Sequence, residues 1–310
     1  MVKLDARGDI AVAEIVLYVP IFFVAIPLVL RHGFTRKAGW IFLILLAIIR
    51  IVGGVTHILF EQKPSNTTLQ IIFNVMEASG LSPLLVASVG FLSTVGQYSL
   101  DDHPLMSRGT RLMGILGTVA LALAIAGGIK AGEAKTQSDL DSGTKLRKIG
   151  SALFGVLYVA IVGVTAFCFQ NKHKILKYRR KLLSGIAAAL PFLFVRVLYA
   201  ILSAFSPSPL GFDADGQRIA VTSSSPLKTF NSTTGRWEVY LGMSVIAEYI
   251  VVLIYTSVGL RTPLNKDEAE YAHAAPVVAY GMQNVQPLTL AEGGQYTGRR
   301  SDEWYKYGAR

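Results

Sequence analysis

Long runs of apolar residues, separated by short polar stretches, dominate the chain up to residue 260. Seven runs are long enough to cross a bilayer, whose hydrocarbon core of about 30 Å takes about 20 helical residues. The predicted spans are residues 10–30, 38–60, 69–97, 112–130, 149–169, 182–205 and 239–260. The pattern therefore predicts an all-α polytopic membrane protein, with a seven-transmembrane-helix bundle in residues 1–262.

The amino-acid composition agrees with this prediction. The chain is 52% hydrophobic and 16% charged, whereas soluble domains carry about 25% charged residues. Its net charge of +10 comes from Lys and Arg clusters beside the apolar runs. We interpret these clusters as membrane-flanking charges, so we expect the lipid bilayer, and not nucleic acid, to be the partner.

Two polar segments stand apart from the spans. Residues 263–310 are polar, with scattered Gly and Pro, and we predict a cytosolic disordered tail. The loop of residues 206–237 contains an Asp215-Gly216 turn signal followed by a short segment of strand character. Either a small hairpin over the mouth of the bundle or a disordered lid fits this loop.

The orientation is predicted from charges and sequons together. With the N-terminus outside, the loops on each side hold eleven Lys and Arg residues before the tail, so the positive-inside rule is nearly undecided. The N-x-[ST] sequons at Asn66 and Asn231 both fall in outer loops of this arrangement. They are candidate N-glycosylation sites, and they favour an N-terminus outside and a C-terminus in the cytosol.

Glycine and proline positions predict local irregularity and close packing. Gly80 and Pro83 interrupt the third span, which is longer than the membrane requires, so we expect it to kink or tilt. The fourth and fifth spans have no acid or base in their apolar cores. Their glycines mark them as packing helices: Gly114, Gly117, Gly127, Gly155 and Gly163.

Four charged residues lie deep in the predicted spans. Arg196 stands in the middle of the sixth span, and a guanidinium there costs at least about 2.5 to 3.5 kcal/mol, so it needs a partner. Arg50, Glu77 and Glu248 lie at similar depth in the second, third and seventh spans. The set is balanced in charge. We expect Glu248 to be the partner of Arg196, because adjacent helices at matched depth need the least reach.

Other polar residues surround this set. Asn74 and Tyr199 lie one turn from Glu77 and Arg196, and we include both with His57 in the predicted site. We interpret His57 as an interfacial hydrogen-bonding residue, because one histidine and a single buried Cys168 supply too few metal ligands. We interpret Glu14 as reaching the lipid headgroups. No metal and no cofactor are expected.

Known seven-helix classes are excluded by the residues they require. The seventh span has no lysine for a retinal Schiff base, and one cysteine cannot form the outer disulfide of animal receptors. Metal-dependent hydrolysis needs several intramembrane histidines. We therefore expect no enzyme activity.

Three motifs resemble an uncharacterised family of fungal seven-helix membrane proteins that is defined by a domain of unknown function. The motifs are Arg50-Ile-Val-Gly-Gly, Glu77-x-x-Gly-Leu-Ser-Pro-Leu-Leu, and the helices with Arg196-x-x-Tyr and Glu248. The layout is loosely similar to fungal lipid-translocating exporter-like and receptor-like seven-helix proteins. The resemblance covers residues 10–260, and it implies no established activity.

Three functions fit the sequence. The leading hypothesis is receptor-like binding of a small or lipid-like ligand in an outward-facing pocket formed by the buried charges. The alternative is a carrier for lipid, organic anion or protons, in which Glu77 or Glu248 changes protonation. The third is a structural membrane protein whose buried ion pairs serve only folding.

Overall fold

The computed structural model describes residues 4–32, 39–63, 66–100, 103–208, 210–213, 217–220, 224–264 and 267. Its elements, in chain order, are α1 Ala6–His32, α2 Ile41–Gln62, α3 Thr67–Ser79, α4 Leu81–Gly96, η2 Leu105–Gly109, α5 Thr110–Gly132, α6 Gln137–Gln170, α7 Lys177–Phe205, β1 Leu210–Phe212, β2 Arg218–Ala220, η3 Pro226–Phe230, α8 Trp237–Tyr240, η4 Leu241–Ile246 and α9 Ala247–Arg261. The predicted disordered tail lies almost wholly outside the described residues.

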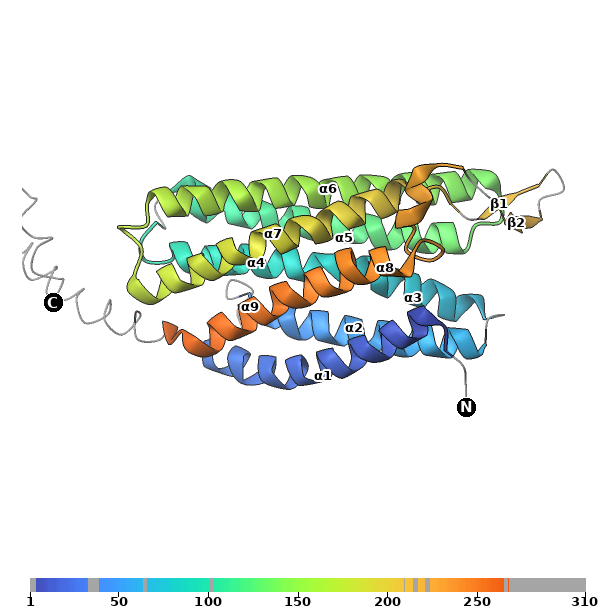
Figure 1. The fold of residues 1–310 in the computed structure, drawn as a ribbon. Helices are drawn as coiled ribbons and strands as arrows, with labels where there is room; N and C mark the ends of the chain where they lie inside the picture. The colour runs from blue at the N-terminus through green and yellow to red at the C-terminus, as the bar shows by residue number, and fades with distance from the viewer. Residues whose placement is uncertain are drawn as a thin grey trace, which may run out of the picture. The chain divides into compact units, whose positions relative to one another are not determined.

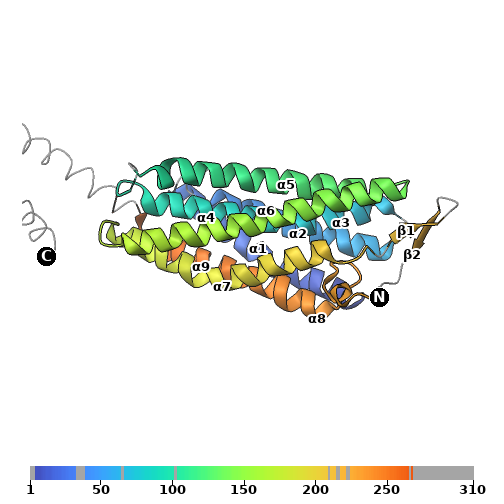
Figure 2. The same ribbon diagram turned by 90° about the horizontal axis from the view of Figure 1, so that it is seen from above.

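Seven helical stretches in this part of the chain are long and apolar enough to cross a membrane. Each corresponds to one predicted span. Figures 1 and 2 show the long helices lying side by side along one direction. The prediction of an all-α, multi-pass membrane bundle is therefore confirmed.

The third span, residues 68–96, forms the centre of the bundle. Within its most apolar window 83% of residues are buried, against 28% to 44% in the other six spans. α4 packs against α2, α5, α6 and α7, and Figure 1 shows it between α2 and the α5–α6 pair. The other helices present apolar faces outward, as lipid-facing helices do.

The predicted irregularity of the third span is present at Gly80, which separates α3 from α4. A Cβ atom added at Gly80 would lie 2.8 Å from Nη2 of Arg50 on α2. The missing side chain therefore makes the space in which the Arg50 guanidinium lies against this helix.

Glycines bring the backbones of α5 and α6 into contact. A Cβ at Gly127 would lie 2.6 Å from the backbone nitrogen of Arg147, and one at Gly143 would lie 2.5 Å from that of Ala131. Such approaches are typical of small-residue interfaces in membranes. The prediction fails for Gly114 and Gly163, where a Cβ would meet nothing within 4 Å, because these two glycines do not face a neighbouring helix.

Helix α6 begins at Gln137, well before the predicted start at residue 149. The side chain of Thr136 accepts a hydrogen bond from the backbone N–H of Asp139 at 3.2 Å and so caps the helix. The additional turns are polar and carry no hydrophobic signal, so a search for membrane-length apolar runs does not detect them.

After the last helix, α9, the chain contacts the start of α7 through Asp267. Asp267 is buried, and its Oδ2 accepts hydrogen bonds from the backbone N–H groups of Tyr178 and Arg179, both at 3.1 Å. N–H groups in the first turn of a helix lack an acceptor within the helix, and Asp267 supplies one to α7. Asp267 thus belongs to the bundle, although the boundary predicted at residue 262 assigned it to the tail.

A short hairpin follows α7. β1 pairs antiparallel with β2, with Leu210 opposite Ala220 and Phe212 opposite Arg218. Of the two structures considered for this loop, the hairpin is confirmed. Its predicted Asp215-Gly216 turn lies outside the described residues.

Candidate functional site

Arg50 is the centre of a buried group of charges contributed by five spans. Its Nε lies 2.6 Å from Oε1 of Glu248, and its Nη2 lies 2.5 Å from Oε2 of the same carboxylate. This is a bidentate contact, the strongest arrangement for an arginine and a carboxylate. The Nη1 atom lies 2.6 Å from Oε2 of Glu77, so one guanidinium links the third and seventh spans.

Arg196 contacts the same two carboxylates from α7. Its Nε donates to Oε2 of Glu248 at 2.9 Å, and its Nη2 lies 3.8 Å from Oε1 of Glu77. The expected partner, Glu248, is therefore the closer one. Arg196 is 2% exposed and Glu248 is 0% exposed, so water does not screen this pair.

Hydroxyl groups donate further hydrogen bonds to the oxygens of these carboxylates. Tyr18 of α1 donates to Oε1 of Glu248 at 2.9 Å. Tyr240 of α8 donates to Oε2 of Glu77 at 2.8 Å, and Ser244 of η4 donates to Oε1 of Glu77 at 3.2 Å. Buried carboxylates need such partners in place of water.

Glu14 corrects one interpretation made from the sequence. It does not reach the headgroups: it is 5% exposed, and its Oε1 lies 3.6 Å from Nη1 of Arg50. The residue shares one face of α1 with Tyr18, four positions later, and this face turns inward. The i, i+4 pair of polar residues in an apolar span is the signal that identifies both. We call Glu14, Arg50, Glu77, Arg196 and Glu248 the charge cluster.

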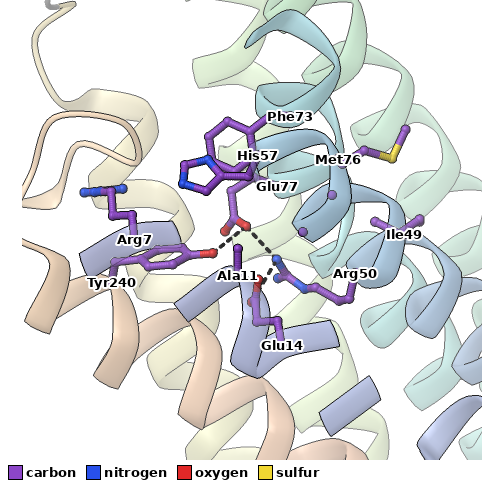
Figure 3. A pocket seen from close by; sticks show the side chains of 12 residues that line it. Arg7, Ala11, Glu14, Ile49, Arg50, His57, Phe73, Met76, Glu77 and Tyr240 are labelled. Atoms are coloured by element: carbon purple, nitrogen blue, oxygen red, sulfur yellow. Dashed lines mark hydrogen bonds and ion pairs between the residues drawn. The ribbon is translucent and has the colours of Figure 1, made fainter. Parts of the chain in front are cut away.

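A small cavity adjoins the charge cluster. Figure 3 shows Glu14, Arg50 and Glu77 directed into it. Its volume is about 10 Å³, which is room for about one water molecule. In this conformation the cavity is too small for an organic ligand.

Arg7 lies at the same cavity and holds the outer segment in place. Its guanidinium is 5.5 Å from the centre of the Tyr240 ring. It donates to the backbone carbonyl oxygens of Ser232 and Gly235. The Arg7 side chain therefore joins the start of α1 to the loop before α8.

The other predicted site residues lie near the charge cluster without joining it. His57 lines the cavity but faces Glu61, with Nε2 at 3.1 Å from Oε1. The Oδ1 of Asn74 accepts from the Thr233 hydroxyl at 3.4 Å, so Asn74 anchors a loop. The Tyr199 ring lies 6.2 Å from that of Tyr240, and its hydroxyl has no hydrogen-bond partner among the described residues.

The two sequons differ in accessibility. Asn66 is exposed, and its Oδ1 caps α3 by accepting from the N–H groups of Thr68 and Leu69. Asn231 is 5% exposed, and its Nδ2 donates to Oγ of Ser206 at 3.1 Å and to the carbonyl of Pro207. Glycosylation modifies this nitrogen, so a glycan on Asn231 is incompatible with the folded loop.

The charge cluster has a surplus of acid. It contains three carboxylates and two guanidinium groups, where the sequence predicted a balanced set of two and two. Arg7 does not correct this surplus, because its guanidinium is directed to backbone carbonyls. An uncompensated buried charge costs several kcal/mol. Among the described residues, the third carboxylate has no guanidinium of its own in the cluster.

The comparison with protein families gives one match. The model of a domain of unknown function, DUF7702, matches residues 4–216. The chain belongs to the DUF7702 family. The matched range includes Glu14, Arg50, Glu77 and Arg196 but ends before Glu248. No curated protein and no solved structure matches the chain. The DUF7702 match agrees with the family of unknown function that the motifs suggested.

Proposed function

We propose that this DUF7702 protein is a proton-coupled carrier and that its charge cluster binds the coupled proton. The surplus carboxylate is the observation that carries the proposal. Glu14 is the best candidate for the protonated group, because its 3.6 Å contact with Arg50 is longer than the contacts of Glu77 and Glu248 with that guanidinium. A proton needs no additional space, which suits a cavity of about 10 Å³.

Helix irregularities beside the charge cluster support movement at this place. α3 ends at Ser79, two residues after Glu77, and α4 resumes at Leu81. The π-helical segment η4 ends at Ile246, two residues before Glu248. π-helical turns are frequent at functional sites. Glu248 thus stands beside a change in helical winding, and Glu77 stands three residues before Gly80, where α3 gives way to α4.

Transport into liposomes tests this proposal. Purified protein is reconstituted into sealed vesicles, and entry of succinate, citrate and a fluorescent phospholipid is followed under inward and outward pH gradients. The phospholipid is included because the layout resembles fungal lipid-translocating exporter-like proteins. We expect flux of at least one probe to follow the pH gradient and to lose this dependence in Glu14→Gln.

Glu238→Gln is the matched control for the transport experiment. Glu238 is a glutamate near the outer end of the seventh span, but its side chain is 46% exposed and pairs only with Arg236. This variant should transport as the wild type does. The absence of flux for every probe under every gradient would contradict the carrier and would favour a purely structural role for the ion pairs.

A second candidate is receptor-like binding of a small or lipid-like ligand, at a place other than the charge cluster. A cavity of about 390 Å³ lies between the start of α6 and the segment after α7, with Asp141, Lys148 and Phe205 in its lining. Ligand pockets commonly measure about 300–1,000 Å³. In nanodiscs, a lysophospholipid probe should raise the melting temperature of the wild type but not of Lys148→Ala. Equal shifts would reject the receptor hypothesis.

The orientation with the N-terminus outside remains part of the proposal, and it now rests on the exposed sequon at Asn66, because Asn231 is buried. With the N-terminus outside, the charge cluster is reached from the outer face past Arg7, and the end of α9 lies on the cytosolic side. The two termini of the seven-span bundle must then face opposite compartments.

A further inference from the structure

Three side chains with metal-ligating atoms gather where α2 ends beside the start of α1. They are Asp5, His57 and Glu61, and their ligand atoms all lie within 4.8 Å of one another. His57 and Glu61 are four residues apart and so share one face of α2. Asp5 comes from the segment just before α1, which makes the group a meeting point of two distant parts of the chain.

The two ring nitrogens of His57 are buried without a hydrogen bond among the described residues. The side chain is 9% exposed, yet neither ring nitrogen makes a hydrogen bond within the described part of the chain. Nε2 lies 3.1 Å from Oε1 of Glu61 without hydrogen-bond geometry, and that oxygen is itself buried and without a hydrogen bond. Buried polar atoms nearly always have partners. Here two potential ligand atoms face each other instead.

The surrounding residues hold the group in place. A Cβ at Gly8 would lie 2.4 Å from Oε2 of Glu61, so only glycine leaves room for this carboxylate. Oδ1 of Asp5 accepts from the backbone N–H groups of Arg7 at 2.7 Å and Gly8 at 2.9 Å. The His57 ring packs on Phe73 with a centroid distance of 4.3 Å.

We propose that Asp5, His57 and Glu61 form a binding site for a divalent transition-metal ion, with Zn²⁺ as the best match. One imidazole nitrogen and two carboxylate oxygens are donors that Zn²⁺ binds at about 2.0–2.2 Å in a tetrahedral arrangement, so the ligand atoms stand about 3.4 Å apart. The present spacing requires only a small adjustment of side chains. Three protein ligands leave one coordination position open.

The site would have a consequence for the fold. A bound ion joins the segment before α1 to the last turns of α2, beside Arg7, which lines the cavity of the charge cluster. This inference revises the interpretation of His57 as a hydrogen-bonding interfacial residue, since the ring makes no such bond among the described residues. It does not depend on the proposed carrier function.

Zinc titration of the full chain tests the site. Protein in nanodiscs is stripped with a chelator and titrated with ZnCl₂ by calorimetry, for the wild type, His57→Ala and Asp5→Asn. We expect one high-affinity site that both variants weaken by at least about tenfold, since lost ligands and their supports cost 10–100-fold in affinity. His173→Ala, at an exposed histidine in the α6–α7 connection, should bind as the wild type does.

Asp5→Asn is the second variant because it should fold like the wild type. Asp5 is exposed and precedes α1, so its change leaves the core intact, even if His57→Ala fails to fold. A second readout is the melting temperature, which Zn²⁺ should raise in the wild type and in His173→Ala but not in Asp5→Asn. Wild-type protein that binds no zinc, or Asp5→Asn that binds it with unchanged affinity, would overturn the proposal.

Discussion

At the scale of the residue, Arg50 determines how the charge cluster is held together. It contacts Glu14, Glu77 and Glu248 with one guanidinium. Its removal would leave three carboxylates facing Arg196 alone. Breaking a buried ion pair by deleting one partner costs about 3–5 kcal/mol, because the remaining charge is uncompensated.

We therefore expect Arg50→Met to lower the free energy of unfolding by about 3–5 kcal/mol, measured by denaturant or thermal unfolding in detergent. Arg236→Met is the control, because Arg236 has a 67% exposed side chain and pairs with an exposed glutamate. Its effect should stay below about 1 kcal/mol. Equal stability of the two variants would show that the contacts of Arg50 do not hold the helices together.

Sequence reasoning identified Arg50, Glu77, Arg196 and Glu248, because a charge in an apolar span has to find a partner. It missed Glu14, which lies only four residues after the predicted start of the first span at residue 10, where a carboxylate can reach water. The position of a residue along a span does not tell which side of the helix faces the bundle, because helix packing decides this. The surplus of acid could therefore not be predicted.

At the scale of the element, α5 and α6 show how glycine position decides packing. Gly143 and Gly163 lie on the same helix, but Gly143 stands among polar residues and Gly163 among mostly apolar ones. A Cβ at Gly143 would meet the backbone of α5, whereas one at Gly163 would meet nothing. The sequence predicted a packing role for Gly163 and not for Gly143, because Gly143 lies before the predicted start of the fifth span at residue 149. The sequence also does not give the rotation of a helix, which decides whether Gly163 faces a neighbour.

Alanine at each position tests this difference. Gly143→Ala should destabilise the bundle by about 1–3 kcal/mol, since backbone atoms of α5 must move away. Gly163→Ala should be neutral or should stabilise by up to about 1 kcal/mol, because alanine favours the helix. Thermal unfolding of the two variants in the same detergent compares them. A more harmful effect at Gly163 would contradict the described interface.

At the scale of the whole molecule, the proposed orientation makes a labelling prediction. The chain has one cysteine, Cys168, which is fully buried and can be replaced by alanine. Lys63 and Lys172 are exposed and lie in connections at opposite ends of the bundle. Each can carry a single new cysteine.

In sealed microsomes with the cytosolic face outward, an impermeant maleimide should label Lys172→Cys at once. Lys63→Cys should react only after detergent opens the vesicles. The α2–α3 connection, with exposed Asn66, then lies in the lumen, as the sequons suggested. The reverse pattern would show that the N-terminus is cytosolic, and would place the mouth of the cavity on that side.

Infrared spectroscopy can show whether the surplus carboxylate of the charge cluster carries a proton, as we propose. A protonated carboxyl group buried in a protein gives a carbonyl stretching band that ionised carboxylates lack. At neutral pH, the wild type and the exposed-site control Glu238→Gln should show this band, and Glu14→Gln should lack it. A wild type without the band would contradict the account.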